Sequence, residues 1–408
     1  MKSSSMGATL ARSILLSLLA CLMAACTIAP IAPSATPFEQ DVSTAVDHLS
    51  SQWLATQPRP AWLVRIFPNS LALGHFADLP AAGLKTSSGF AQPESIATAK
   101  ARQIAARRLE ARHEFRQIAA NQAPDLLLSA SLSADKVLTL VLEDRQEHRI
   151  VARWQGPVRV DAADLFPGRY SNDSPVIFML PKAVSDTALF GRPDSMPLPE
   201  QDYAMRAQLA LLEDARSAYD SGDYEMALQL FKNAAAQPSA LAMRAYNGQY
   251  LSYRALGREA LANAAFKRVI EEGLKTRTLA IKLLFMPGQT SFWSDPAISG
   301  SYGFWIQELS AQAAASTRCL EVAGHTSHTG TEDFNLGLSL ARSKVVAGML
   351  QADQPGLAHR LSAVGMGWSQ NIVGSGTDDA RDAIDRRVEF KISDCPPAAP
   401  AAPTTPAN

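Results

Sequence analysis

The sequence predicts an α+β protein with three folded parts, and three patterns carry this prediction. Within residues 41–180, a long helix-forming stretch is followed by runs of alternating apolar residues, an order typical of a mixed α/β domain. Within 201–275, small and aromatic residues recur after about 35 residues, which indicates paired helices. Within 278–394, the patterns follow the order βαβαββ, which predicts a two-layer domain.

The composition is that of a packed globular protein. The chain has 408 residues, of which 47% are hydrophobic, and its formal net charge is -1. This length accommodates two or three domains of about 150 residues each. Because phosphate binding requires an excess of basic residues, nucleic acid is not expected as a partner.

The N-terminus has the features of an export signal over residues 1–25. Lys2 and Arg12 provide positive charge, and 13–25 is a short apolar run that ends in small residues. This run is too short to cross about 30 Å of hydrocarbon as a helix. A cleaved signal peptide is therefore predicted.

The end of this run indicates lipid attachment. The segment Leu22-Met23-Ala24-Ala25-Cys26 resembles the lipobox of bacterial lipoproteins, in which the cysteine is lipidated. Thr27 follows, and in enterobacterial lipoproteins a residue other than aspartate there implies the outer membrane. The resemblance thus implies a palmitate-type lipid on Cys26 and a chain anchored in the outer membrane, facing the periplasm. The alternative is an ordinary secretory signal with incidental cysteines.

Three segments have compositions that do not favour a packed core. Residues 26–40 are rich in Ala, Pro, Ser and Thr and are predicted to form a flexible tether. Residues 181–200 hold several prolines and few apolar runs, which indicates a linker. Residues 395–408 have a composition like that of the tether and are expected to form a disordered tail.

Within the first domain, Trp62–Phe67 is a strand candidate that Pro68 would end, and 94–121 is a strong helix former without Gly or Pro. Alternation predicts strands at 126–132, 137–141 and 150–154, the first of them half-buried. The predicted helix carries arginines that form either a surface for an acidic partner or a solvated face: Arg102, Arg107, Arg108, Arg112 and Arg116. No motif indicates the role of this domain.

The helical part contains an internal repeat. Gly222, Ala227 and Phe231 recur with the same spacing as Gly257, Ala262 and Phe266. The pair, over 205–274, resembles the tetratricopeptide repeat, in which small residues let two helices pack closely. A peptide-binding groove and a helical spacer are both compatible with this pattern.

Two cysteines remain once the signal and Cys26 are set aside. Cys319 and Cys395 are a natural disulfide pair in an oxidising periplasm. A disulfide that closes the loop between these two cysteines would stabilise the fold by about 4 kcal/mol. The alternative is two buried free thiols.

The elements of the last domain follow from periodicity. They are a strand at 281–285, a helix at 304–315, a strand at 319–323, a helix at 334–350 and strands at 360–364 and 387–392. The second helix is predicted to present one apolar side, formed by Leu338, Ala341, Val345 and Met349.

Motifs in this region resemble the OmpA C-terminal family, which shares a fold with the peptidoglycan-associated lipoprotein. They are Val322-Ala323-Gly324-His325-Thr326-Ser327, then Asn335, Leu338-Ser339-Leu340-Ala341-Arg342, and finally Asp385-Arg386-Arg387-Val388-Glu389. The resemblance covers residues 278–394 and places the last strand antiparallel beside the second. That placement makes the pairing of Cys319 with Cys395 geometrically sensible.

The resemblance implies that this domain binds peptidoglycan through the diaminopimelate of a stem peptide. The Arg342 guanidinium would grip the carboxylate of that zwitterion through two parallel hydrogen bonds. The implied binding residues are Thr326, Ser327, Asn335, Arg342 and Arg386.

Ser327 stands where the family has an aspartate. A hydroxyl brings no charge, and losing a charge-assisted bond of about 1.5–3 kcal/mol would weaken binding roughly 10- to 150-fold. Glu332 or Asp333 is a hypothetical source of the missing carboxylate. The serine is compatible with three outcomes: weakened peptidoglycan binding, a different ligand, or a domain that has only a structural role.

The chemistry of the remaining residues argues against catalysis. His325 and His328 are close in sequence, but further metal ligands at suitable spacing are missing, so His325 is expected to orient its loop by hydrogen bonding. The sequence shows no Cys-His pair, zinc-ligand set or nucleophile elbow, so neither an enzyme nor a cofactor is expected. The leading prediction is a tether between outer membrane and wall. The alternative is a scaffold or activator whose residues 41–275 recruit a protein of cell-wall synthesis or secretion.

Overall fold

A computed structural model of the chain describes residues 35–79, 95–178, 189–194, 196–236, 239, 241–372, 376 and 382–395. The predicted signal, Cys26, most of the tether, part of the linker and the tail beyond Cys395 lie outside these residues. None of the described helices is long and apolar enough to cross a membrane.

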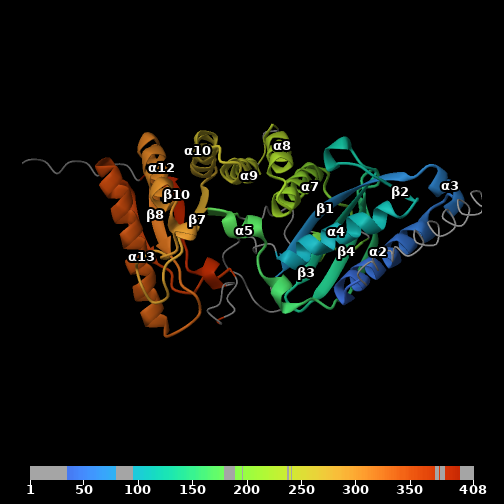
Figure 1. The fold of residues 1–408 in the computed structure, drawn as a ribbon, viewed down its shortest axis with the longest axis horizontal. Coiled ribbons are helices and arrows are strands. Elements are labelled where there is room, and N and C mark those ends of the chain that lie inside the picture. Colours follow the sequence, from blue (N-terminus) through green and yellow to red (C-terminus); the bar gives the residue numbers. More distant parts are fainter. Residues whose placement is uncertain are drawn as a thin grey trace, which may run out of the picture. The chain divides into compact units, whose positions relative to one another are not determined.

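The first sheet has five strands in the order β2-β1-β3-β4-β5. Their bounds are β1 Asn69–Leu79, β2 Phe115–Gln117, β3 Leu126–Ser133, β4 Val137–Asp144 and β5 Arg149–Pro157. Strand β1 pairs in parallel with β2 and β3, and the other pairs are antiparallel. Helices α2 (Pro37–Thr56) and α4 (Ile96–Glu110) bury their apolar sides against one face of this sheet (Figure 1).

Helix α7 (Glu200–Asp220) covers the opposite face of the same sheet. Ala72 on β1 and Leu127 on β3 pack with Ala210 of this helix. Strand β3, which alternation predicts to be half-buried, is therefore buried on both faces. The first sheet thus uses a helix that the sequence assigns to the helical part.

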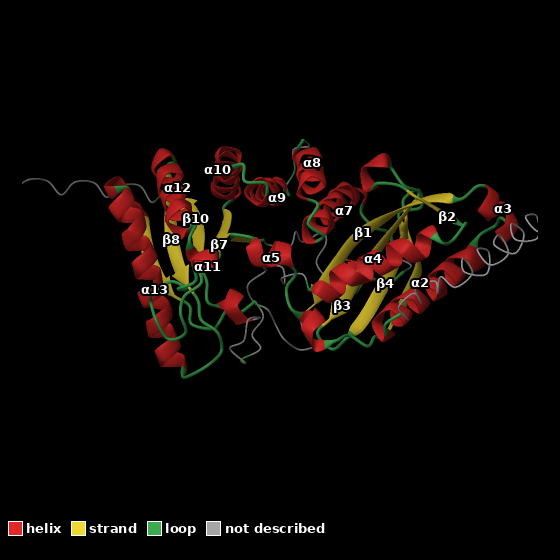
Figure 2. Ribbon diagram, in the orientation of Figure 1, coloured by secondary structure: helices red, strands yellow, loops and turns green. Residues whose placement is uncertain are grey.

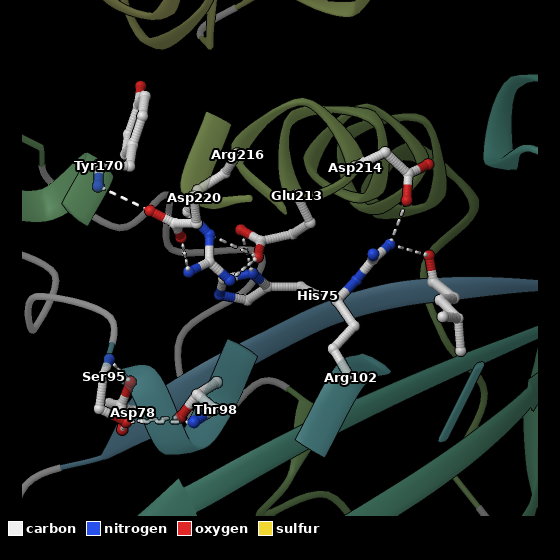
Figure 3. A network of polar contacts seen from close by, with 11 residues as sticks. His75, Asp78, Ser95, Thr98, Arg102, Tyr170, Glu213, Asp214, Arg216 and Asp220 are labelled. Carbon is white, nitrogen blue, oxygen red and sulfur yellow. Dashed lines mark hydrogen bonds and ion pairs between the residues drawn. The ribbon is translucent and has the colours of Figure 1, made fainter. Parts of the chain in front are cut away.

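Figure 3 shows the buried polar contacts that join α7 to the first sheet. Arg102 on α4 donates to Asp214 across 2.6 Å. Glu213 lies 3.4 Å from the Nδ1 atom of His75 on β1 and accepts from Arg216 at 2.7 Å. These contacts place charged groups on both sides of the junction, where burial favours their mutual pairing.

Two further carboxyl groups, both partly buried, belong to the network of Figure 3. Asp220, near the end of α7, accepts from the backbone N–H of Tyr170, and Asp78 on β1 accepts from the N–H and hydroxyl of Ser95, which begins α4. Burial raises the pKa of both Asp78 and Asp220, despite these hydrogen bonds.

Three predictions in this region are wrong. Trp62–Phe67, predicted as a strand, lies almost entirely in helix α3 (Ala61–Ile66), which Pro60 precedes at the N-cap. The predicted helix 94–121 ends at Glu110, because 115–117 joins β1 as strand β2. Helix α2 begins at Pro37, inside the predicted tether, because Phe38 and Val42 are buried in the core.

Helices α7 to α10 follow one another and each packs on the next. After α7 come α8 (Tyr224–Ala235), α9 (Ala242–Ala255) and α10 (Glu259–Thr276). The repeated glycines Gly222 and Gly257 have φ of +86° and +69°, in the turns between α7 and α8 and between α9 and α10. The tetratricopeptide resemblance itself stays a prediction.

The second sheet has the order β6-β7-β10-β8-β9, and Figure 2 shows β7, β10 and β8 of this sheet side by side. Its strands are β6 Val176–Ile177, β7 Thr278–Ile281, β8 Arg318–Gly324, β9 Leu361–Gly365 and β10 Val388–Asp394, and β8 is parallel to β9. Strand β7 ends where the predicted strand 281–285 would begin, and β6, from before the helical part, forms one edge. Helices α12 (Tyr302–Ala315) and α13 (Glu332–Asp353) pack together beside it.

Four 3-10 helices and two short α-helices complete the described elements. They are 120–122, 162–165, 355–360 and 382–385, with α5 Arg169–Asp173 and α11 Pro296–Ser299.

Helix α13 does not bury the apolar side that its sequence predicts. Val345 and Met349 are exposed, and Leu338 and Ala341 are only partly buried. The buried side is mostly polar and consists of Asn335, Ser339, Arg342, Ser343, Val346 and Leu350. The helix therefore presents hydrogen-bonding groups to the loops at the end of the second sheet.

Candidate functional site

The candidate site lies where the parallel strands β8 and β9 end against α13. Gly324 and Gly365 are register partners at the ends of these strands. A Cβ atom on Gly324 would lie 2.1 Å from the carbonyl oxygen of Ser339, and one on Gly365 would lie 2.6 Å from that of Leu336. Only glycine permits this approach, which fixes the loop 325–331 against the helix.

Asn335 holds the loop in place. Its Nδ2 donates to the carbonyl oxygens of Thr329 and Thr331, at 2.7 and 3.0 Å. Thr331 is the N-cap of α13, and its hydroxyl accepts from the N–H of Phe334. Asn335 is 3% exposed, so its amide organises the loop rather than facing solvent.

Thr326 and Ser327 are also buried. The Thr326 N–H donates to the carbonyl of Gly367, and its hydroxyl has no hydrogen-bond partner within the described part of the chain. The Ser327 hydroxyl lies 3.3 Å from that of Thr329. The hypothetical substitutes for the family aspartate, Glu332 and Asp333, are exposed in the first turn of α13.

Arg342 does not face an open crevice, which differs from the expectation. The residue is 1% exposed, its Nε donates to the carbonyl of Gln289 at 2.9 Å, and one Nη donates to that of Met286 at 3.0 Å. The guanidinium also lies over the ring of Phe285, 5.1 Å from its centre. The physical reason is that the turn 286–291 packs onto α13, where its carbonyl oxygens accept hydrogen bonds from the guanidinium group.

The two arginines before β10 have different surroundings. Arg387 is fully buried, and its Nε donates to Glu389 at 2.7 Å while an Nη donates to the carbonyl of Gln370 at 2.9 Å. Arg386 lines a cavity whose described walls include none of the other four implied binding residues. The structure thus brings Thr326, Ser327 and Asn335 together around the loop 325–331, while Arg386 lines that cavity.

The electrostatics of the site centre on His325 and Glu389. The His325 ring is fully buried, with its Nε2 atom 3.5 Å from Glu389 Oε1, so it faces strand β10. Its role in orienting the loop stays a prediction. Burial lowers the pKa of His325, although Glu389 opposes this. Burial would raise the pKa of Glu389, but His325 and Arg387 outweigh it and the pKa is lowered.

Sequence reasoning missed the turn 286–291 and the pairing of Arg387 with Glu389. The turn carries no motif, because it acts through backbone carbonyls. The pairing had a signal, since residues 387 and 389 alternate onto the same face of a strand.

The ends of β8 and β10 are joined covalently. Cys319 and Cys395 form a disulfide with a Cα–Cα distance of 4.9 Å, and Cys319 lies opposite Ser393 in the antiparallel pair. Within the described residues, three or more His, Cys, Asp or Glu side chains do not gather as a metal site would require.

Comparisons with known proteins identify the last domain. Residues 284–385 match the model of the OmpA family. No curated protein sequence matches the chain.

Solved structures resemble part of the chain. The peptidoglycan-associated lipoprotein from Burkholderia pseudomallei is 22% identical over 27% of this chain and 88% of its own, with a TM-score of 0.24. The cell wall anchor of the T6SS from Pseudomonas aeruginosa is 23% identical over 28% of this chain and 77% of its own, with a TM-score of 0.23. The periplasmic domain of Helicobacter pylori MotB is 16% identical over 28% of this chain and 74% of its own, with a TM-score of 0.23. The family match shows that this chain contains an OmpA-family domain, spanning residues 284–385.

Proposed function

We propose that the chain is a non-catalytic envelope lipoprotein that binds peptidoglycan through residues 278–394. In this proposal, lipid on Cys26 holds it in the outer membrane, and the domains between the two ends position envelope components. The observation that carries the proposal is the OmpA-family match over residues 284–385. The ordered loop and helix motifs around Thr326, Asn335 and Arg342 support it.

Binding through Arg342 requires the turn 286–291 to withdraw. The carbonyls of Met286 and Gln289 occupy the guanidinium fork, but they are neutral acceptors. A carboxylate forms bonds roughly twice as strong as a neutral acceptor does. Because residues 287–291 are exposed, their displacement would disturb few buried contacts. A stem-peptide carboxylate would then replace both carbonyls.

The scaffold or activator function is a second candidate, and the burial of Arg342 favours it. If the turn never opens, the last domain presents no carboxylate-binding fork. Residues 41–275 would then recruit a protein of cell-wall synthesis or secretion, with weak wall binding or none.

Sedimentation of the purified full chain with peptidoglycan sacculi tests the proposal. Arg342→Ala should abolish pelleting, whereas Lys344→Ala, an exposed cation on the same helix, should leave it unchanged. Ser327→Asp should tighten binding roughly tenfold, because it restores a charged acceptor.

A variant of the turn separates the two candidates without touching the arginine. Gly288 has φ of +65° and no atom within 4 Å of an added Cβ. Gly288→Ala should strain only the turn, by about 1–2 kcal/mol, and should therefore strengthen sacculus binding several-fold. Unchanged binding in both Gly288→Ala and Arg342→Ala would contradict capture at this fork. A wild-type chain that stays in solution would favour the scaffold.

A further inference from the structure

The most exposed large apolar side chains of the described residues lie on and just after helix α3. Trp62, Ile66 and Phe67 are 63%, 59% and 62% exposed, more than any other large hydrophobic residue that the structure describes. Trp62 and Ile66 are four positions apart on the helix and therefore share a side, and Phe67 is its C-cap. We call these three residues the α3 patch. Because such a cluster is unfavourable in water, a surface that covers it is expected.

The α3 patch belongs to a segment that is fixed to the first sheet. Val64, elsewhere on the same helix, is fully buried in the core. Arg59 donates to Asn69 at 2.6 Å, and Arg65 Nε donates to Glu114 at 3.0 Å, just before β2. Figure 1 shows α3 next to β2. The three apolar side chains are thus presented by an ordered element, which reduces the entropy lost when they bind a surface.

The segment that carries the α3 patch is basic. Residues 57–68 contain Arg59 and Arg65 and no acidic residue. The Arg65 side chain is 59% exposed and that of its partner Glu114 is 5% exposed, so the cation faces solvent. Arg116, on the strand β2 that pairs with the residues after α3, is also exposed. Arginines beside exposed aromatic rings match a surface with anionic headgroups over an apolar interior, which is that of a phospholipid bilayer.

The size of the α3 patch also favours a bilayer over a protein partner. Aromatic side chains bury about 150–250 Å² each, so the three residues together offer roughly 600 Å² at most. A stable protein interface buries about 800 Å² on each partner. A bilayer has no such requirement, because a few inserted apolar side chains act together with electrostatic attraction to the headgroups.

The length of chain before α2 allows the α3 patch and the lipid proposed on Cys26 to reach one bilayer. Pro37, the first residue of α2, follows Cys26 by eleven positions, which an extended chain spans over at most about 40 Å. Helix α2 has 20 residues and is therefore about 30 Å long, and α3 begins five positions after it ends. The reach of the N-terminal segment thus exceeds the length of α2.

We propose that the α3 patch inserts into the headgroup region of an anionic phospholipid bilayer and forms a second membrane contact of the chain. Trp62 and Phe67 enter the boundary between headgroups and acyl chains, and Arg65 and Arg116 contact the phosphate groups. The inference rests on the proposed anchoring in a membrane and adds to it a site on the folded protein. A contact through α3 would orient the first sheet relative to the bilayer.

Sedimentation with phospholipid vesicles tests the proposal on the chain from Thr27 onwards. This chain lacks Cys26 and retains every described helix and strand. It should bind vesicles that contain phosphatidylglycerol. It should bind pure phosphatidylcholine at least about tenfold more weakly, because the arginines lose their anionic partners. Trp62→Ser combined with Phe67→Ser should weaken binding to the anionic vesicles at least about tenfold.

A matched control replaces two exposed apolar residues elsewhere. Met226 and Leu261 are 51% and 50% exposed, and Met226→Ser combined with Leu261→Ser should leave vesicle binding unchanged. All four positions are exposed, so urea unfolding of both variants should resemble that of the wild type. Equal vesicle binding by the two double variants would overturn the proposal. A wild-type chain that stays in solution with both kinds of vesicle would also overturn it and would assign the α3 patch to a protein partner.

Two further measurements separate this inference from the proposed lipid anchor. Tryptophan emission should shift to shorter wavelength when the wild-type chain from Thr27 binds vesicles, and Trp62→Phe should remove most of that shift. The mass of the full chain isolated from membranes shows whether Cys26 carries lipid. A chain without lipid would refute the anchor and leave the vesicle result unaffected, whereas a shift that persists in Trp62→Phe would refute insertion of the α3 patch alone.

Discussion

At the scale of single residues, replacing Gly324 or Gly337 by alanine is expected to have opposite effects on stability. Gly324→Ala would bring a Cβ within 2.1 Å of the Ser339 carbonyl, so it should cost about 3 kcal/mol or more in stability. Gly337 lies on α13 with no atom within 4 Å of an added Cβ, so Gly337→Ala should stabilise by about 0.5–1 kcal/mol. Urea unfolding of both variants measures this, and equal effects would contradict the close approach of β8 to α13.

The buried ring of His325 should make the stability of the folded protein depend on pH. Its folded pKa lies below the ordinary value of 6.5, so the unfolded chain takes up the proton first as pH falls. The stability contributed by the neutral ring is present above pH 6.5 and is lost as pH falls towards the folded pKa. The loss is at most about 1.4 kcal/mol per pH unit.

His325→Gln should therefore remove part of the acid destabilisation that begins near pH 6.5, seen as a shallower slope of unfolding free energy against pH. His359 is exposed, so His359→Gln should keep the wild-type slope. A slope in His325→Gln identical to that of the wild type would rule out a buried neutral ring.

The sequence motifs could indicate which residues gather at the loop, but not whether they are open to solvent. Asn335 follows the loop by one helical turn, so its position is a local property. The closure of Arg342 depends on carbonyls more than fifty positions earlier, at Met286 and Gln289. Backbone acceptors of this kind leave no residue-type signal.

At the scale of elements, the arginines of α4 serve two different purposes. Arg102 has 6% side-chain exposure and pairs with Asp214 of α7, whereas Arg107 is 66% exposed and pairs with Glu39. Arg102→Met should cost about 1–3 kcal/mol, because it leaves Asp214 without its donor. Arg107→Met should change stability by less than about 0.5 kcal/mol.

Thermal or urea unfolding of the two methionine variants checks this difference. Equal losses would mean that α4 presents a uniform solvated face, and the docking of α7 through Arg102 would then be incorrect.

The strands that could be predicted are those with regular apolar patterns. Strands β3 and β4 follow such patterns, and the structure contains both. Strand β1 was missed because it lies between β2 and β3 with helices on both faces, so Ala72, His75 and Phe76 are all buried and no alternation remains. The apolar side of α13 was predicted to be buried, but the helix buries its polar side instead. The reason is related, because Gly324 and Gly365, which end β8 and β9, pack closely against the backbone of α13 on that side.

At the scale of the whole molecule, sequence segments and packing units do not coincide. Helix α7 belongs by sequence to the helical repeats but covers the first sheet. Strand β6, at residues 176–177, precedes those repeats in the sequence but adds a strand to the second sheet. Composition cannot indicate such exchanges, because they depend on contacts between distant segments. The division into 41–180, 201–275 and 278–394 therefore remains a proposal about function.

The central claim is that the OmpA-family domain recognises the stem peptides of the wall. The most direct measurement is sedimentation of the wild-type full chain with intact sacculi and with sacculi whose stem peptides have been removed by an amidase. Our account predicts saturable pelleting with intact sacculi and none with the stripped glycan. Equal pelleting with both preparations, or none with either, would contradict it.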